Sequence, residues 1–158
     1  MRRVIVLVLS LLMAETVMAE TIGSVDTTFR VLGSNDKIVV EAFDDPRVNG
    51  VSCYLSRAKT GGVTGSIGLA EDKSDSSVAC RQVSTTISFK SSLPRQEEVF
   101  SERASILFKR IHVVRMVDVG RRMLVYLVYS DKLIDGSPKN SITAVALPTG
   151  VELSIKKE

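Results

Sequence analysis

The feature that most constrains the fold is the segment between Cys53 and Cys80, the only two cysteines of the 158-residue chain. This segment holds four of the ten glycines and interrupts an alternation of apolar and polar residues that runs through most of the chain. A disulfide here would close a loop of about 27 residues and stabilise the fold by roughly 3–4 kcal/mol. We expect a disulfide-closed excursion from a β-sheet. Two reduced buried thiols are the alternative, and a redox pair is less expected because such pairs are usually C-x-x-C.

The first nineteen residues have the pattern of a secretory signal peptide. Arg2 and Arg3 precede an apolar run over 4–14, and Val17-Met18-Ala19 provides small or moderate residues at the −3 and −1 positions. The run is shorter than the roughly 20 residues that span a bilayer. We therefore expect cleavage after Ala19, export, a single domain over 20–158 and no stable membrane insertion after cleavage. An oxidising compartment also favours the disulfide.

Charge and composition argue against nucleic acid as a partner. Removing Arg2, Arg3 and Glu15 leaves 19 basic and 17 acidic residues, a net charge of +2. Tryptophan is absent and aromatic residues make up 5% of the chain, which disfavours base stacking.

Alternating apolar residues predict a mainly β domain. Strands are expected over 22–31, 37–43, 51–57, 83–89, 99–118, 122–130 and 142–147, with a hairpin turn at Val119-Gly120. One short helix is expected over 69–80, because Asp72 or Ser74 can cap it. The strand over 122–130 is apolar on both faces, which predicts cover on both sides. The fold class is therefore α+β, mainly β: an antiparallel sandwich or barrel-like curled sheet of about seven strands, with one short helix and one disulfide.

Catalytic motifs are incomplete. His112 is the only histidine and lies among apolar strand residues, so we interpret it as an ordinary strand histidine and expect no metal site. Ser56-x-x-Lys59 followed by Thr60-Gly61 resembles motifs of penicillin-recognising enzymes, but Ser56 ends a β pattern where that chemistry needs a helix. The glycine spacing matches no phosphate-binding loop.

Charged residues form two patterns that are compatible with binding. Acidic pairs such as Asp44-Asp45 and Glu97-Glu98 are interpreted as solvated turns, although opposed carboxylates serve glycoside hydrolysis. Six basic residues between Arg103 and Arg122 would form a basic surface for an anionic partner, or a plain solvated face.

Several long segments resemble the CreA family of exported bacterial proteins. They are IVVEAFDDP (38–46), VSCYLSRAKTGG (51–62), GLAEDKSD (68–75), ACRQV (79–83) and YLVYSDKLIDGSPKNSITAV (126–145). The resemblance covers about 22–145. It implies a small periplasmic protein of Gram-negative bacteria with Cys53 and Cys80 at its two motif cysteines. It implies no agreed activity, substrate or catalytic residue.

The leading functional hypothesis is a non-enzymatic periplasmic module that binds an envelope protein or a polar ligand without a cofactor. Polar residues on or directly beside two segments, 57–71 and 130–140, would supply the contacts: Arg57, Lys59, Asp72, Asp131, Lys132, Ser137, Lys139 and Asn140. The alternatives are a hydrolase of an envelope polymer that uses carboxylates such as Asp44, Asp72 or Asp131, and a thiol-redox protein that uses Cys53 and Cys80.

Overall fold

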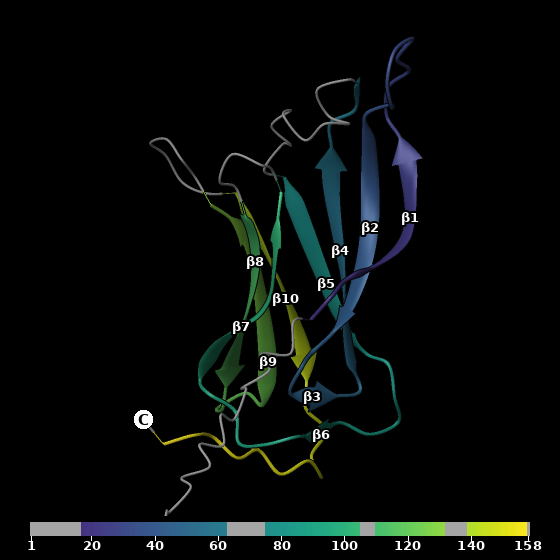
Figure 1. Ribbon diagram of the computed structural model, residues 1–158. Coiled ribbons are helices and arrows are strands. Elements are labelled where there is room, and N and C mark those ends of the chain that lie inside the picture. Colours follow the sequence, from purple (N-terminus) through teal and green to yellow (C-terminus); the bar gives the residue numbers. More distant parts are fainter. Residues whose placement is uncertain (1–16, 63–74, 105–109, 132–138, 158) are drawn as a thin grey trace, which may run out of the picture.

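The computed structural model describes residues 17–62, 75–104, 110–131 and 139–157, and every element bounded within them is a strand. The strands are β1 (Glu20–Asp26), β2 (Lys37–Asp44), β3 (Val48–Asn49), β4 (Val51–Lys59), β5 (Ser76–Gln82), β6 (Ser88–Phe89), β7 (Gln96–Arg103), β8 (Arg110–Asp118), β9 (Met123–Ser130) and β10 (Asn140–Ala146). They form two four-stranded antiparallel sheets, ordered β1-β2-β4-β5 and β10-β9-β8-β7, and a ribbon of β3 and β6 (Figure 1). The predicted mainly β, antiparallel architecture is confirmed. The expected count of about seven strands is wrong, since the described residues form ten, and of the strand expected over 83–89 only Ser88–Phe89 is present.

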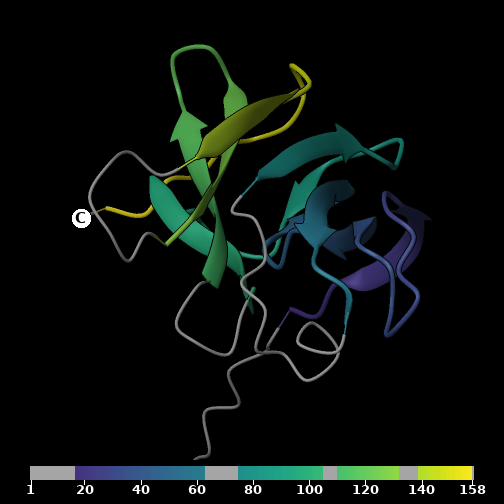
Figure 2. The ribbon, with the colours of Figure 1, turned by 90° about the horizontal axis from the view of Figure 1, so that it is seen from above.

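The two sheets share one hydrophobic core. Phe43 of β2 stacks on Phe100 of β7, with ring centroids 4.4 Å apart. Along the opposite seam, β5 lies beside β10, and the Val78 backbone N–H donates a hydrogen bond of 3.2 Å to the Ser141 hydroxyl. Figure 2 shows this meeting of the two sheets from above. Among the described residues β1 and β7 each have a strand on one side only, so the sheets do not close into a barrel.

The predicted helix over 69–80 is wrong for its second half, and residues 69–74 lie outside the described part of the chain. Residues 76–82 form β5, in which Val78 and Cys80 are buried while Ser77 and Ala79 are not. The edge of β4 pairs with this segment from Arg57↔Ser76 to Val51↔Gln82. Pairing with β4 and burial of alternate residues outweigh the helix propensity of this segment.

The disulfide is confirmed, although its setting differs from the expectation. Cys53 and Cys80 are direct partners across β4 and β5, their Cα atoms are 4.0 Å apart, and both side chains are fully buried. The bridge therefore joins two neighbouring strands of one sheet, where a link between a strand and a helix was expected. It fixes their register on the core side.

The long stretch predicted over 99–118 begins within β7 and ends with β8, and the hairpin to β9 turns at residues 119–122 as expected. Leu124, Tyr126 and Val128 of β9 are buried against the core. On the opposite face of β9, Met123, Val125, Leu127 and Tyr129 are only half-buried. The expected cover on both faces is therefore confirmed for the inner face alone within the described residues.

Replacing both cysteines by serine should lower the free energy of unfolding by about 3–4 kcal/mol, because the unfolded chain regains the freedom of a 27-residue loop. Urea denaturation of the oxidised wild type and of the Cys53→Ser/Cys80→Ser protein measures the difference, with reduced wild type as the control. A double variant that unfolds at the wild-type midpoint but no longer supports the function of the protein in the cell would show that the cysteine pair has a chemical role rather than a stabilising one.

Candidate functional site

A buried ion cluster joins the two sheets at Asp45, just after β2. The Arg115 guanidinium, on the inner face of β8, donates to both Asp45 oxygens at 2.6 and 2.7 Å, and neither side chain is exposed. The Tyr126 hydroxyl donates to Asp45 Oδ2 at 2.8 Å. Burial, and then the charge of Asp45, raise the pKa of Tyr126 well above its ordinary value, so the phenol stays protonated.

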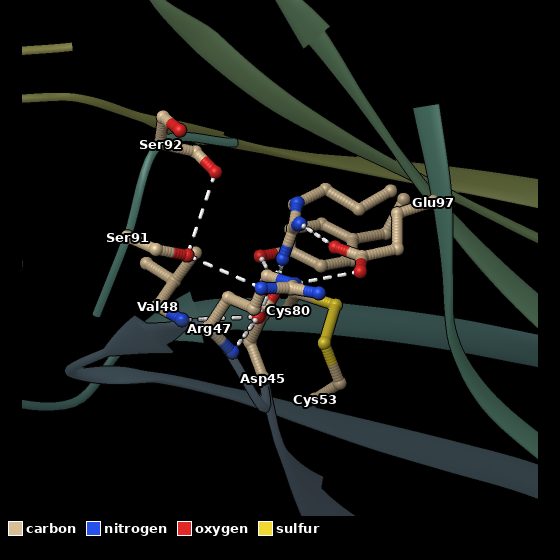
Figure 3. A network of polar contacts seen from close by, with 10 residues as sticks. Asp45, Arg47, Val48, Cys53, Cys80, Ser91, Ser92 and Glu97 are labelled. Carbon is tan, nitrogen blue, oxygen red and sulfur yellow. Dashed lines mark hydrogen bonds and ion pairs between the residues drawn. A yellow bond between two sulfur atoms is a disulfide. The ribbon is translucent and has the colours of Figure 1, made fainter. Parts of the chain in front are cut away.

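The same carboxylate organises the chain around it. The backbone N–H groups of Arg47 and Val48 donate to Asp45 Oδ1 at 2.8 and 3.0 Å, and Arg47 in turn donates to Glu97 Oε1 at 2.6 Å. Glu97 also accepts a hydrogen bond from Arg115. Figure 3 shows Asp45, Arg47 and Glu97 converging, with the disulfide in the same view. With every charge paired, this cluster has the character of a structural site.

A second ion cluster lies on the inner face at the other end of β2 and β4. Arg57 Nε lies 2.8 Å from Glu41 Oε2, the Lys59 ammonium lies 3.2 Å from Glu41 Oε1, and Arg57 also bonds Glu102 of β7 across the core. Burial alone raises the pKa of Glu41, but the Arg57 and Lys59 contacts outweigh it and hold that pKa below its ordinary value. Burial likewise opposes the charge of Arg57, and its two carboxylate partners raise its pKa.

His112 contacts two carboxylates on the outer face of the second sheet. Its Nδ1 lies 2.5 Å from Glu98 Oε2, its Nε2 lies 3.0 Å from Asp131 Oδ1, and its ring stacks on Tyr129 at 5.0 Å. Both nitrogens donate to these oxygens only when the ring carries two protons. Ser101 is the cross-strand partner of His112, but no ring nitrogen remains to accept its proton, so this geometry does not form a serine–histidine relay.

A cleft opens at the end of the seam between the sheets, where β4 ends and β5 and β10 begin. Its volume is about 570 Å³ and its polar lining includes Ser56, Arg57, Asp75, Ser76, Lys139 and Asn140. We call it the seam cleft. The Lys139 ammonium pairs with Asp75 at its mouth. The Ser76 hydroxyl oxygen is buried and has no hydrogen-bond partner among the described residues. These groups offer donors and acceptors to a polar ligand, without a nucleophile paired to a base.

The structure brings together some of the sequence-predicted contact residues. Arg57, Lys139 and Asn140 line the seam cleft, although the Arg57 residue is only 4% exposed and is held by its carboxylates. Lys59 pairs with Glu41 beside the cleft, and Asp131 belongs to the His112 cluster. Three further residues lie outside the described part of the chain: Asp72, Lys132 and Ser137.

Two of the carboxylates proposed for hydrolysis, Asp44 and Asp131, are described by the structure, and they belong to separate sites. Asp44, at the end of β2, accepts a hydrogen bond from Ser52, whereas Asp131 contacts His112 beyond the end of β9. Within the described residues no group of three metal-ligating side chains could hold an ion. In the same part of the chain no helix has the length and apolar character needed to cross a membrane.

Comparison with known proteins identifies the family of this chain. The family model described as CreA protein matches residues 22–149. The chain belongs to the CreA family. Protein CreA of Escherichia coli strain K12 is 54% identical over 130 residues, which cover 80% of this chain and 83% of the relative, and the same values hold for Protein CreA of E. coli O157:H7. No solved structure matches. Every residue that lines the seam cleft lies within the segment shared with the family.

Sequence reasoning missed the two buried ion clusters. It grouped Arg115 with a basic surface, which is wrong because this side chain is fully buried. A signal was present: Arg115 alternates with Val113 and Val117 on one face of β8, and an arginine at an inward position requires a buried acid. Glu41 shows the same signal, because it alternates with the buried Val39 and Phe43 on one face of β2. No comparable local signal identifies Asp45 or Glu102 as partners, since each meets an arginine of the other sheet.

Asp45→Ala should lower the free energy of unfolding by about 3–5 kcal/mol, because it leaves the buried Arg115 charge short of its principal partner. Chemical denaturation measures the loss. Asp118→Ala is the matched control, since Asp118 pairs with the 82% exposed Arg121 side chain at the surface, and it should leave the midpoint close to wild type. Equal losses in the two variants would contradict the role given to Asp45.

Glu41→Gln should lower the free energy of unfolding at neutral pH, and this difference from wild type should disappear in acid. The folded-state pKa of Glu41 lies below its ordinary value of 4.5, so its contribution is present above that pH and is lost as the pH falls further. Thermal unfolding of wild type and variant between pH 7 and pH 3 measures how the difference in their melting temperatures shrinks as the pH falls. Glu152→Gln, on the exposed C-terminal tail, should give a curve parallel to wild type; a Glu41→Gln curve parallel to wild type would refute the assignment.

Proposed function

We propose that this CreA-family protein is an exported, non-enzymatic binding module of the cell envelope, and that the seam cleft is its contact site. The single observation that carries the proposal is the cleft itself, a recess within the family segment whose wall includes charged, hydroxyl and amide side chains, three of them from residues expected to make contacts. The two sheets form a rigid support for this site. The disulfide holds β4 and β5 in register, and the two ion clusters hold one sheet against the other.

The chemistry of the cleft suits a polar partner. Lys139 is 62% exposed and its partner Asp75 is 54% exposed, so either charge can exchange its present contact for one with a ligand. The buried Ser76 hydroxyl would be satisfied by such a ligand. A segment or small molecule that carries both an anionic group and hydrogen-bonding groups therefore fits best, with no bond made or broken.

Site-specific photo-crosslinking from Ser77, which lines the cleft, should give an adduct in intact cells, whereas the same probe at Glu152 should not. Lys139→Ala combined with Asn140→Ala should reduce the adduct at least about tenfold, as expected for the loss of a charge-assisted hydrogen bond. Lys156→Ala with Lys157→Ala is the control and should leave the adduct unchanged.

The same material tests export. The adduct should be recovered from the periplasmic fraction, and its protein part should begin at Glu20. A Ser77 probe that gives no adduct, or an adduct that is insensitive to Lys139 and Asn140, would exclude the seam cleft as the contact site.

A further inference from the structure

The outer face of the second sheet is apolar across three adjacent strands. Two consecutive cross-strand rows, Ile142–Leu127–Val114 and Ala144–Val125–Met116, run across β10, β9 and β8 on the side away from the core. We call these two rows the β8–β10 face. Their side chains stand next to one another, because directly paired residues of antiparallel strands project to the same side.

This face remains partly exposed to solvent. Ile142 is 65% exposed, Ala144 is also exposed, Met116, Val125 and Leu127 are half-buried, and Val114 is buried. The outer face of an antiparallel sheet is commonly solvated, and it then carries polar residues where these two rows carry apolar ones. A contiguous apolar surface on a well-packed sheet therefore indicates an interaction surface.

We propose that a second copy of this chain covers the β8–β10 face, forming a two-fold symmetric dimer by face-to-face packing of the two sheets. A two-fold contact places the same surface on both partners, so a surface with one sign of charge would repel itself. The six residues of the two rows carry no charge, so the face meets this requirement, and the nearest carboxylate flanks it at Glu98, the β7 partner of Val114. A flat sheet face is also the natural complement of another flat sheet face.

Charges at the two ends of the face select the orientation. One end carries the Asp131 carboxylate beside His112, and the other carries the Asp118–Arg121 pair, whose guanidinium side is 82% exposed. Packing with the strands in the same direction would place Asp131 against its own copy. Packing with the strands reversed places Asp131 near Arg121 of the second copy, which is favourable.

The size of the face sets the strength of the dimer. Three strands at about 4.8 Å spacing and two rows, which span about four residues at about 3.4 Å, give an apolar face of roughly 14 by 14 Å, close to ~200 Å². A standard interface buries about 800 Å² on each partner. The dimer should therefore be weak and depend on concentration, with the charged ends contributing the remainder of the contact.

Sedimentation equilibrium of the mature, oxidised protein tests the proposal. The wild-type mass should rise toward twice the monomer mass with increasing concentration. Leu127→Lys, at the centre of the face, should stay monomeric at a concentration where wild type is half dimeric. Tyr54→Lys is the matched control, because Tyr54 is 40% exposed on β4 of the other sheet, and it should dimerise like wild type.

Two further variants keep the test decisive if Leu127→Lys fails to fold. Ile142→Lys places the charge on a side chain that is already 65% exposed and should also stay monomeric. Arg121→Glu should weaken the dimer about two- to tenfold, as reversal of a rim charge does. A wild-type protein that remains monomeric at every concentration, or a folded Ile142→Lys protein that dimerises like wild type, would overturn the proposal. So would a photo-crosslink from position 142 that joins the chain only to lipid or to a different protein.

Discussion

The contact between Asp45 and Arg115 is the interaction on which the relative placement of the two sheets depends. A guanidinium with no exposed surface on a central strand is costly unless it is fully neutralised, and Asp45, just after β2 of the other sheet, accepts two short hydrogen bonds from it. The same carboxylate accepts hydrogen bonds from the Tyr126 hydroxyl and from two backbone N–H groups. One residue thereby fixes the end of β2, the start of β3 and two strands of the second sheet.

The cluster around Arg57 repeats this arrangement with the charges exchanged. Here the first sheet supplies the arginine and the second sheet supplies Glu102, whereas Asp45 and Arg115 have the opposite distribution. Sliding one sheet over the other would separate both pairs and leave buried charges without partners. The apolar core between the clusters supplies most of the burial, and the charges specify a single alignment. The shape of the seam cleft depends on that alignment, because Arg57 forms part of its wall.

Local patterns in the sequence were sufficient for most strands. The alternation over 37–43, 51–57 and 122–130 corresponds to β2, β4 and β9 within a few residues, and the hairpin after Val119-Gly120 is present. They failed at β5, where serine and acidic residues suggested a helix start, because the free edge of β4 outweighs a weak local preference. They failed also over 83–87, which alternates in sequence but is not a strand. They placed His112 correctly in a strand without revealing its two carboxylates, since Glu98 was assigned to a solvated turn and cross-strand register is not visible locally.

By itself the sequence determined that this is a mainly β, antiparallel domain with one disulfide and the features of the CreA family. These properties follow from residue periodicity, cysteine number and shared segments, all of which are local or additive along the chain. Only the tertiary structure decided that the disulfide links two neighbouring strands, that Arg115 and Arg57 are buried ion partners, and that an apolar sheet face stays partly exposed. Those properties depend on which distant residues meet, and that is set by strand register and the packing of one sheet on the other.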